Sequence, residues 1–277
     1  MVSKGYGMLL ETYHYTEKWD KVLSSALDSK NTLLIVFASA NIEHIRTPLL
    51  ELSNIFKNSI IIGASTAGEI YMDELFEDSF VVAVMQFQNT RLRNSICTLI
   101  SADNSYDDGV DIANDLLSSD LKGVFILSDG LNANGSKLTE GLSSVIPNNI
   151  PITGGLAGDA ERFEQTWILV DNKPMTGFVC AVGLYGSYIH MLHSSLIESN
   201  LHLDAYKNEA ILSLLIGCFS RSTAPKKENL EAILNLMPPK AQQIGFYSYG
   251  EISSLAWEKC DLDNQTMTLT LIWESKI

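Results

Sequence analysis

A short phrase occurs twice in this chain, each time after a strand-like run and a helical stretch. The run IVFASAN (35–41) leads to IIGASTAG (61–68), and the run VFILSDG (124–130) leads to ITGGLAGD (152–159). Each apolar run has the length of a buried strand, and each glycine phrase has the composition of a tight turn. The pattern therefore predicts two copies of one βαβ-type unit.

The two copies keep an almost constant spacing along the chain. The glycine turns lie 91 residues apart, from Gly63 to Gly154. The segments that follow the turns also align, with a slow drift that is typical of a duplication with small loop insertions. We place the copies at about 30–101 and 122–197, and expect a binding site between the two halves.

The composition indicates a folded, acidic protein. The chain has 277 residues, of which 46% are hydrophobic and 19% charged, and its formal net charge is −14. Binding to nucleic acid or to an anionic membrane needs clustered Lys and Arg, and the longest basic run is Lys226-Lys227. We therefore expect neither nucleic acid nor membrane as a partner.

Two further patterns indicate a cytoplasmic location. No apolar run approaches the roughly 18–20 residues of a membrane span, and the N-terminal sequence has too short an apolar stretch for a secretory signal. The four cysteines are scattered and form no CxxC pair. That distribution favours free thiols over a disulfide framework or a zinc site.

The hydrophobic periodicity predicts both strands and helices. The expected strands are 31–39, 59–63, 80–87, 93–101, 122–128, 150–154, 165–170, 177–185, 188–197, 243–250 and 265–274. The expected helices are 19–27, 42–56, 110–117, 136–145, 205–217 and 228–236. We expect 80–87 and 93–101 to be antiparallel neighbours, joined by the turn 88–90.

These elements together predict an α/β fold with mixed sheets, built from the duplicated βαβ-type unit plus antiparallel hairpins, with the helices packed outside. We expect two domains. The first covers residues 1–197 and contains the duplication, and the second covers 198–277.

The two glycine turns are candidates for a ligand pocket. They lack the lysine of a phosphate loop and the spacing of a dinucleotide fingerprint, and the sequence around Ser65 is not a nucleophile elbow. The glycines either serve tight turns and close packing, or expose amides to a ligand at the strand ends. The candidate ligand-binding residues here are Gly63, Ser65, Thr66, Gly154, Gly155 and Asp159.

A third phrase, GFYSYGEI (245–252), combines tyrosines, glycines and a carboxylate. Tyr247 and Tyr249 would share one face of a strand, and a buried tyrosine needs a partner for its hydroxyl. Glu251 could accept such a bond or face a ligand. These three residues are further ligand-binding candidates, with a structural sheet edge as the alternative.

Two histidines, His190 and His193, occur in the second copy where the first has Asn94 and Cys97. On a strand they point to opposite faces, so only one could enter a given site. Each is either a hydrogen-bonded structural residue or a tentative axial ligand of haem iron, for which imidazole is a usual donor. No CxxCH is present, so a haem b would be held non-covalently. No paired carboxylates, metal cluster or nucleophile motif indicates an enzyme.

Several ordered phrases resemble the FIST sensory domain. IIGASTAGEI, ITGGLAGDAERFEQTWILVDN and GFVCAVGLYG resemble its N-terminal part, over roughly residues 30–195. GFYSYGEI and NQTMTLTLI resemble the end of its C-terminal part. FIST proteins usually carry about a hundred more residues between these parts, so the resemblance implies a shortened C-terminal domain here.

The resemblance implies a bacterial signal-transduction input module that binds a small ligand. Amino acids are proposed ligands of the family, and a subset binds haem and senses nitric oxide, controlling a separate histidine kinase. The first hypothesis is therefore a haem-binding nitric oxide sensor. The alternatives are a non-haem sensor of an amino acid or similar polar ligand, and a ligand-free scaffold whose acidic face docks a basic partner. Homo-oligomerisation stays open, and an enzyme ranks last.

Overall fold

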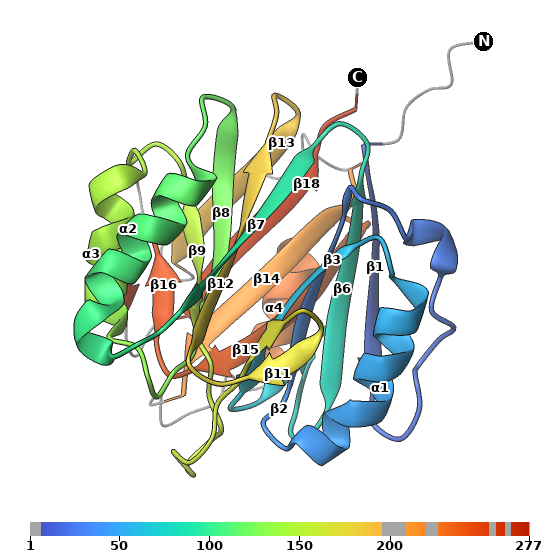
Figure 1. Ribbon diagram of the computed structural model, residues 1–277. Helices are drawn as coiled ribbons and strands as arrows, with labels where there is room; N and C mark the ends of the chain where they lie inside the picture. Colours follow the sequence, from blue (N-terminus) through green and yellow to red (C-terminus); the bar gives the residue numbers. More distant parts are fainter. Residues whose placement is uncertain (1–6, 196–208, 220–226, 255–258, 264–266, 277) are drawn as a thin grey trace.

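A computed structural model of the chain describes residues 7–195, 209–219, 227–254, 259–263 and 267–276 (Figure 1). Strands β1 to β18 form three sheets of six strands each, and helices pack outside them. The predicted α/β class with mixed sheets is confirmed.

Each sheet has the same internal order of long and short strands. Sheet 1 contains β1 (Met8–Tyr15), β6 (Phe80–Phe87), β2 (Thr32–Ser39), β3 (Ile60–Thr66), β10 (Ile168–Val170) and β11 (Lys173–Met175). Sheet 2 contains β7 (Arg91–Thr98), β12 (Phe178–Tyr185), β8 (Leu121–Ser128), β9 (Ile152–Leu156), β16 (Glu251–Ser253) and β17 (Asp261–Asp263). Sheet 3 contains β13 (Ile189–Ser195), β18 (Met267–Glu274), β14 (Ile211–Cys218), β15 (Ala241–Ser248), β4 (Glu69–Tyr71) and β5 (Glu74–Phe76).

The described residues form three repeats, whereas the sequence predicted two copies. We call them repeat 1 (β1–β6), repeat 2 (β7–β12) and repeat 3 (β13–β18). In each repeat, one glycine pairs with the neighbouring parallel strand at the same place in the ladder, namely Gly63, Gly154 and Gly245. A Cβ at any of these glycines would overlap the neighbouring strand, so each permits a close approach of two backbones.

The repeats exchange their short hairpins in a cycle. The hairpin β4–β5 of repeat 1 pairs with β15 of sheet 3, and β10–β11 of repeat 2 pairs with β3 of sheet 1. In turn, β16–β17 of repeat 3 pairs with β9 of sheet 2. Every sheet is therefore completed by residues from a different repeat.

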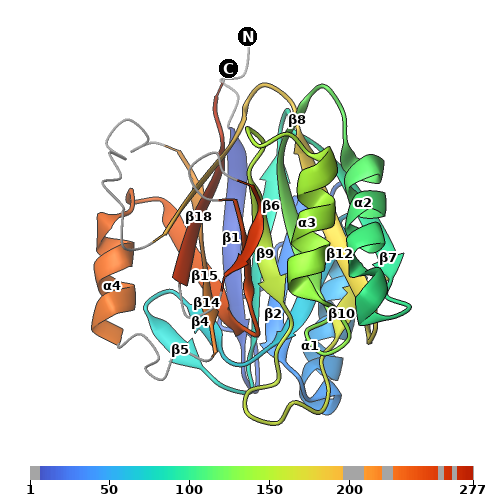
Figure 2. The same ribbon diagram turned by 90° about the vertical axis from the view of Figure 1, so that its left-hand side faces the viewer.

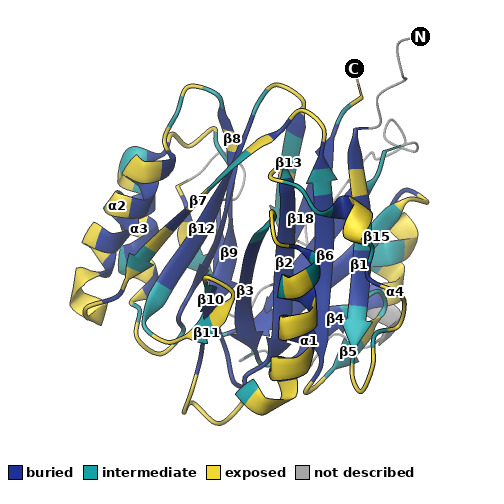
Figure 3. Ribbon diagram, turned by 45° about the vertical axis from the view of Figure 1, so that its right-hand side comes forward, coloured by how far each residue is buried: buried dark blue, intermediate teal, exposed yellow. Residues whose placement is uncertain are grey.

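The helices cover the outer faces of the sheets (Figures 1 and 2). Helix α1 (Ile42–Ile55) packs on sheet 1, α2 (Ser105–Leu116) and α3 (Gly135–Val145) on sheet 2, and α4 (Lys227–Leu236) on sheet 3. Their apolar faces are buried and their polar faces are exposed (Figure 3).

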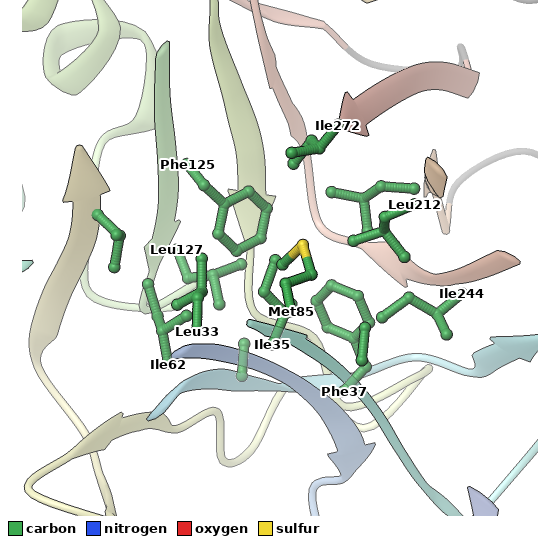
Figure 4. Packing of buried hydrophobic residues seen from close by; sticks show 14 of the residues in the cluster. Leu33, Ile35, Phe37, Ile62, Met85, Phe125, Leu127, Leu212, Ile244 and Ile272 are labelled. Carbon is green, nitrogen blue, oxygen red and sulfur yellow. The ribbon is translucent and has the colours of Figure 1, made fainter. Parts of the chain in front are cut away.

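The inner faces of the three sheets meet in one hydrophobic core (Figure 4). Phe37 of sheet 1 stacks on Phe246 of sheet 3 with ring centroids 4.3 Å apart, and Phe125 and Leu127 come from sheet 2. Each fully buried Leu, Ile or Phe stabilises the fold by about 1.5–3 kcal/mol. Burial on both faces explains why strands such as β2 are continuously apolar.

Two predicted helices are wrong. The run expected as a helix over 205–217 contains strand β14, which is buried along its whole length, while residues 205–208 lie outside the described part. A short apolar run fits a buried strand as well as a buried helix, and here two neighbouring strands decide the outcome. The helix expected at 19–27 is reduced to a 3₁₀ turn, Ser25–Leu27, and Val22 is exposed.

The predicted hairpin of 80–87 with 93–101 is also wrong, because β6 belongs to sheet 1 and β7 to sheet 2. The turn between them is held by Glu274 of β18. Its carboxylate accepts hydrogen bonds from Gln88 N (2.7 Å), Asn89 N (2.8 Å) and Thr90 Oγ1 (2.6 Å). This anchor lies at the point where the chain passes from one sheet to the next.

The division into domains at residue 197 stays a prediction. Sheets 2 and 3 each contain described strands from both sides of that position.

Candidate functional site

Three segments cross from sheet to sheet at the carboxyl ends of the parallel strands, and they meet one another. Each pair is joined by a backbone hydrogen bond of 2.9 Å: Ala67 N to Tyr247 O, Leu156 N to Gly250 O, and Gly158 N to Ser65 O. These segments contain the three glycine phrases that the sequence singles out. The fold thus brings together stretches about 90 residues apart in the chain.

A cavity of about 340 Å³ opens beside this junction, and all three repeats line it. Its lining includes Ser39, Thr66, Glu69 and Asp78 from repeat 1, Glu161 and Arg162 from repeat 2, and Phe219 from repeat 3. Its volume is in the range of small-molecule sites, and it lies where α/β sheets usually bind ligands.

Glu69 lies at this cavity with its side chain buried, 1% exposed. Its carboxylate accepts hydrogen bonds from Thr66 Oγ1, from Ser79 N (3.0 Å) and from Ser79 Oγ (2.9 Å). Burial raises the pKa of Glu69 to about 7, although these hydrogen bonds oppose the shift. The residue therefore exchanges its proton near neutral pH.

The rim of the cavity carries charges of both signs. Glu77, Asp78 and Glu161 are exposed carboxylates, and Arg162 is the only Lys or Arg among the described lining residues. Asp78 Oδ1 accepts a hydrogen bond from Ser39 Oγ (2.7 Å) and lies 3.6 Å from His44 Nδ1. A ligand with an ammonium and a carboxylate matches this distribution.

Among the candidates from the first two glycine turns, only Thr66 lines this cavity. Gly63 and Gly154 serve close strand packing, and Gly155 lies against Phe246. Ser65 is fully buried, and its Oγ accepts a hydrogen bond from Trp167 N (3.0 Å).

Asp159 and Tyr249 do not line the cavity, but they bind the adjacent loop, 160–165. The Asp159 carboxylate accepts a hydrogen bond from Tyr249 OH. It also accepts bonds of 2.8–2.9 Å from the amides of Phe163, Glu164 and Gln165. Burial opposes ionisation, but the Gln165 amide and the Tyr249 hydroxyl lead the hydrogen bonds that hold the pKa of Asp159 below its usual value. Both residues therefore order the loop that carries Glu161 and Arg162.

The other candidates of the third phrase are buried away from the cavity lining. Tyr247 is 4% exposed, and its backbone pairs with Ala67 and Gly68. Glu251 is fully buried at the start of β16, opposite Gly155 of β9.

The two histidines lie on β13, and neither lines this cavity. His190 stacks on Trp273 with centroids 5.0 Å apart, and its Nε2 lies 2.5 Å from Ser275 Oγ. His193 Nδ1 lies 2.7 Å from Thr270 Oγ1. Burial lowers the pKa of both imidazoles, that of His193 to about 4, so both are neutral near pH 7.

The surroundings of these histidines do not fit a haem. His193 lines a cavity of only about 120 Å³, against about 300–1,000 Å³ for typical small-molecule and cofactor sites. His190 already uses its ring face and one nitrogen. Haem ligation therefore stays a prediction, and the described residues around these histidines form no cavity of haem size.

Sequence reasoning missed most residues of the cavity. Glu69 follows Gly68 in GASTAGE just as Glu251 follows Gly250 in GFYSYGE. Aligning the third phrase with the first would have selected both glutamates. Arg162 and Phe219 carry no local signal, because only the fold brings them to the cavity.

The fold and the cavity define an α/β protein of three cyclically joined repeats with a polar pocket at their junction. Residues 32–196 match the FIST N domain, and the chain belongs to this family. The domain is associated with sensory signalling, as the sequence phrases indicated.

No curated protein matches the chain. The crystal structure of cyanuric acid hydrolase from A. caulinodans is similar with a TM-score of 0.47 and 7% sequence identity, over 97% of this chain and 99% of that chain.

Two features are absent from the described residues. None of the described helices is long and apolar enough to cross a membrane. No group of three or more His, Cys, Asp or Glu side chains in the same residues is placed to hold a metal ion.

Proposed function

We propose that this protein is a signalling sensor that binds a free amino acid in the cavity at the ends of β2 and β3. Membership of the FIST family supports a sensory role. The observation that carries the ligand class is the pairing of carboxylates with Arg162 around one small cavity. An α-amino acid has both complementary charges within a few bond lengths.

In this proposal each lining group has a distinct part. Arg162 binds the ligand carboxylate, since a guanidinium can donate two parallel hydrogen bonds. Glu77, Asp78 and Glu161 attract the ammonium. Phe219 supplies an apolar surface for the ligand side chain.

The output passes to a separate protein, and a histidine kinase is the partner that the family resemblance favours. The protein itself acts in the cytoplasm without catalysing a reaction. A bound ligand that touches all three repeats would tighten their junction, which gives the partner a surface that differs between the free and bound states.

Thermal unfolding in the presence of each free amino acid tests the ligand class. A ligand at a hundred times its Kd should stabilise the protein by about 2.7 kcal/mol. Arg162→Gln and Asp78→Asn should each raise the ligand concentration needed for this stabilisation at least tenfold. Glu140→Gln on the exposed face of α3 is the matched control and should bind normally. If no amino acid stabilises the wild type, the proposed ligand class is wrong.

The haem hypothesis is tested separately by an absorption spectrum after expression with haem supplied. A stoichiometric Soret band that shifts with nitric oxide would restore it, and His190→Ala and His193→Ala would then locate the axial ligand. A featureless spectrum would exclude haem b for this chain and leave the amino acid proposal untouched.

A further inference from the structure

A side chain from sheet 3 hydrogen-bonds to β1, the edge strand of sheet 1. Gln242 Oε1 accepts hydrogen bonds from Thr12 N (2.9 Å) and Thr12 Oγ1 (2.7 Å), and its Nε2 donates to Leu10 O (2.8 Å). One primary amide thus satisfies the outward N–H of Thr12 and the outward C=O of Leu10. We call this contact the amide plug.

The repeat symmetry defines the equivalent place between sheets 3 and 2. Gln242 lies three residues before Gly245, and Pro151 lies three residues before the equivalent Gly154. Proline has no side-chain amide, so no plug can form from this position.

The edge strand at this second place is β13. The strand pairings, counted outward from the equivalent glycines, make His193 the equivalent of Thr12. Their pairing partners, Thr270 and Ala83, are likewise equivalent. Met191 then takes the place of Leu10. Alternate residues of an antiparallel strand direct both backbone groups to one edge, so His193 N–H and Met191 C=O point outward like those of Thr12 and Leu10.

A cavity of about 120 Å³ lies where the plug is missing. Its lining contains Asn148, Asn149, Pro151, Met191, His193 and Ser254. A water needs roughly 10–15 Å³ of such space, so the cavity holds a molecule of a few non-hydrogen atoms. Met191 and His193 make no hydrogen bond beyond those of the ladder and the His193 ring among the described residues.

Two residues behind His193 are polar where their equivalents at the plugged place are apolar. His193 Nδ1 lies 2.7 Å from Thr270 Oγ1, which lies 2.8 Å from Thr153 Oγ1. The equivalent residues at the plugged place are Ala83 for Thr270 and Ile244 for Thr153. The second ring nitrogen, His193 Nε2, is buried without a hydrogen-bond partner in the described structure.

We propose that the cavity beside β13 binds a small free molecule bearing a primary carboxamide. Its oxygen accepts the hydrogen bond from His193 N, and its NH₂ group donates to Met191 O, as the Gln242 amide does for Thr12 and Leu10. The site is separate from the cavity at Glu69 and independent of the amino acid proposal.

Acetamide is the direct probe, observed through the imidazole resonances of His193 in NMR spectra of the full chain. We expect a saturable shift with a millimolar Kd. N,N-dimethylacetamide has no N–H to donate and should give no such shift. Equal shifts with both compounds, or none with acetamide, would overturn the proposal.

Two variants test the geometry. Pro151→Gln supplies the missing amide, so it should abolish the acetamide shift while leaving amino acid binding intact. Gln242→Ala removes the existing plug and should create a second acetamide site, detected at Thr12. If Pro151→Gln does not fold, the gain of a site in Gln242→Ala, together with the dimethylacetamide control, decides. A folded Pro151→Gln that still binds acetamide normally would contradict the assignment.

Discussion

The hydroxyl of Tyr249 donates a hydrogen bond to the carboxylate of Asp159, and so joins the crossing segments of repeats 3 and 2. The same hydroxyl lies 2.7 Å from Ala160 O, and the Tyr249 ring stacks on Phe163 with centroids 4.6 Å apart. One tyrosine thus fixes both ends of the loop that carries Arg162 to the cavity.

Loss of this contact should weaken ligand binding, although neither Tyr249 nor Asp159 lines the cavity. Tyr249→Phe keeps the stacking and removes the hydroxyl, which should destabilise the protein by about 1–3 kcal/mol because Asp159 loses a donor. Asp159→Ala leaves three amides without their acceptor and should cost more. Chemical denaturation measures both, and a double-mutant cycle should give a non-zero coupling. Phe163→Ala, at an exposed ring, is the milder control.

The equivalent glycines predict a graded series. Gly154→Ala and Gly245→Ala would drive a methyl group into the backbone carbonyls of Ile126 and Leu215, whereas at Gly63 the nearest atoms lie at 2.8 Å and include two side chains. We expect losses above about 3 kcal/mol for the first two and a smaller loss for Gly63→Ala. Thermal unfolding of the three variants checks the order, and equal losses would contradict it.

Glu69 predicts a pH dependence of stability. Its pKa is raised in the folded state, from 4.5 to about 7, so the folded protein holds this proton more tightly than the unfolded chain. The contribution is fully present below pH 4.5 and is lost as the pH rises through 7, on the order of 3 kcal/mol. Glu69→Gln should flatten this part of the stability profile. Glu77→Gln, an exposed neighbour, should leave it unchanged.

Replacing Glu274 should destabilise the turn between β6 of sheet 1 and β7 of sheet 2. Glu274→Ala removes the acceptor for two backbone amides and the Thr90 hydroxyl, so we expect a loss of about 2–4 kcal/mol. Hydrogen exchange at Gln88 and Asn89 should accelerate more than exchange in β2. Unchanged protection of these two amides would show that the turn does not depend on Glu274.

Much of the fold was predictable, because buried strands such as β2 and β8 are recognisable in the sequence as continuous apolar runs. The third repeat escaped detection because its turn, GFYSYGEI, replaces small residues with aromatic ones. The pairing of the strands could not be predicted either. The exchange of hairpins and the separation of β6 from β7 depend on contacts made by distant residues such as Glu274.

The candidate site was predictable only in its location. The glycine phrases do meet at the strand ends, as expected for α/β sheets, but most of their side chains serve backbone packing. The charged lining of the cavity comes from Glu77, Asp78, Glu161 and Arg162, which lie in loops without a periodic pattern. Only the tertiary arrangement brings these residues to one cavity.

The cyclic exchange of hairpins determines the order in which the sheets can be completed during translation. Sheet 1 needs β10 and β11, and therefore cannot be complete until residue 175 has left the ribosome. Sheet 2 waits for β17, which ends at Asp263, while β4 and β5 wait for strands of repeat 3. Until then the nascent chain exposes unpaired strand edges. A chaperone that shields such edges would act before β15 and β17 have left the ribosome.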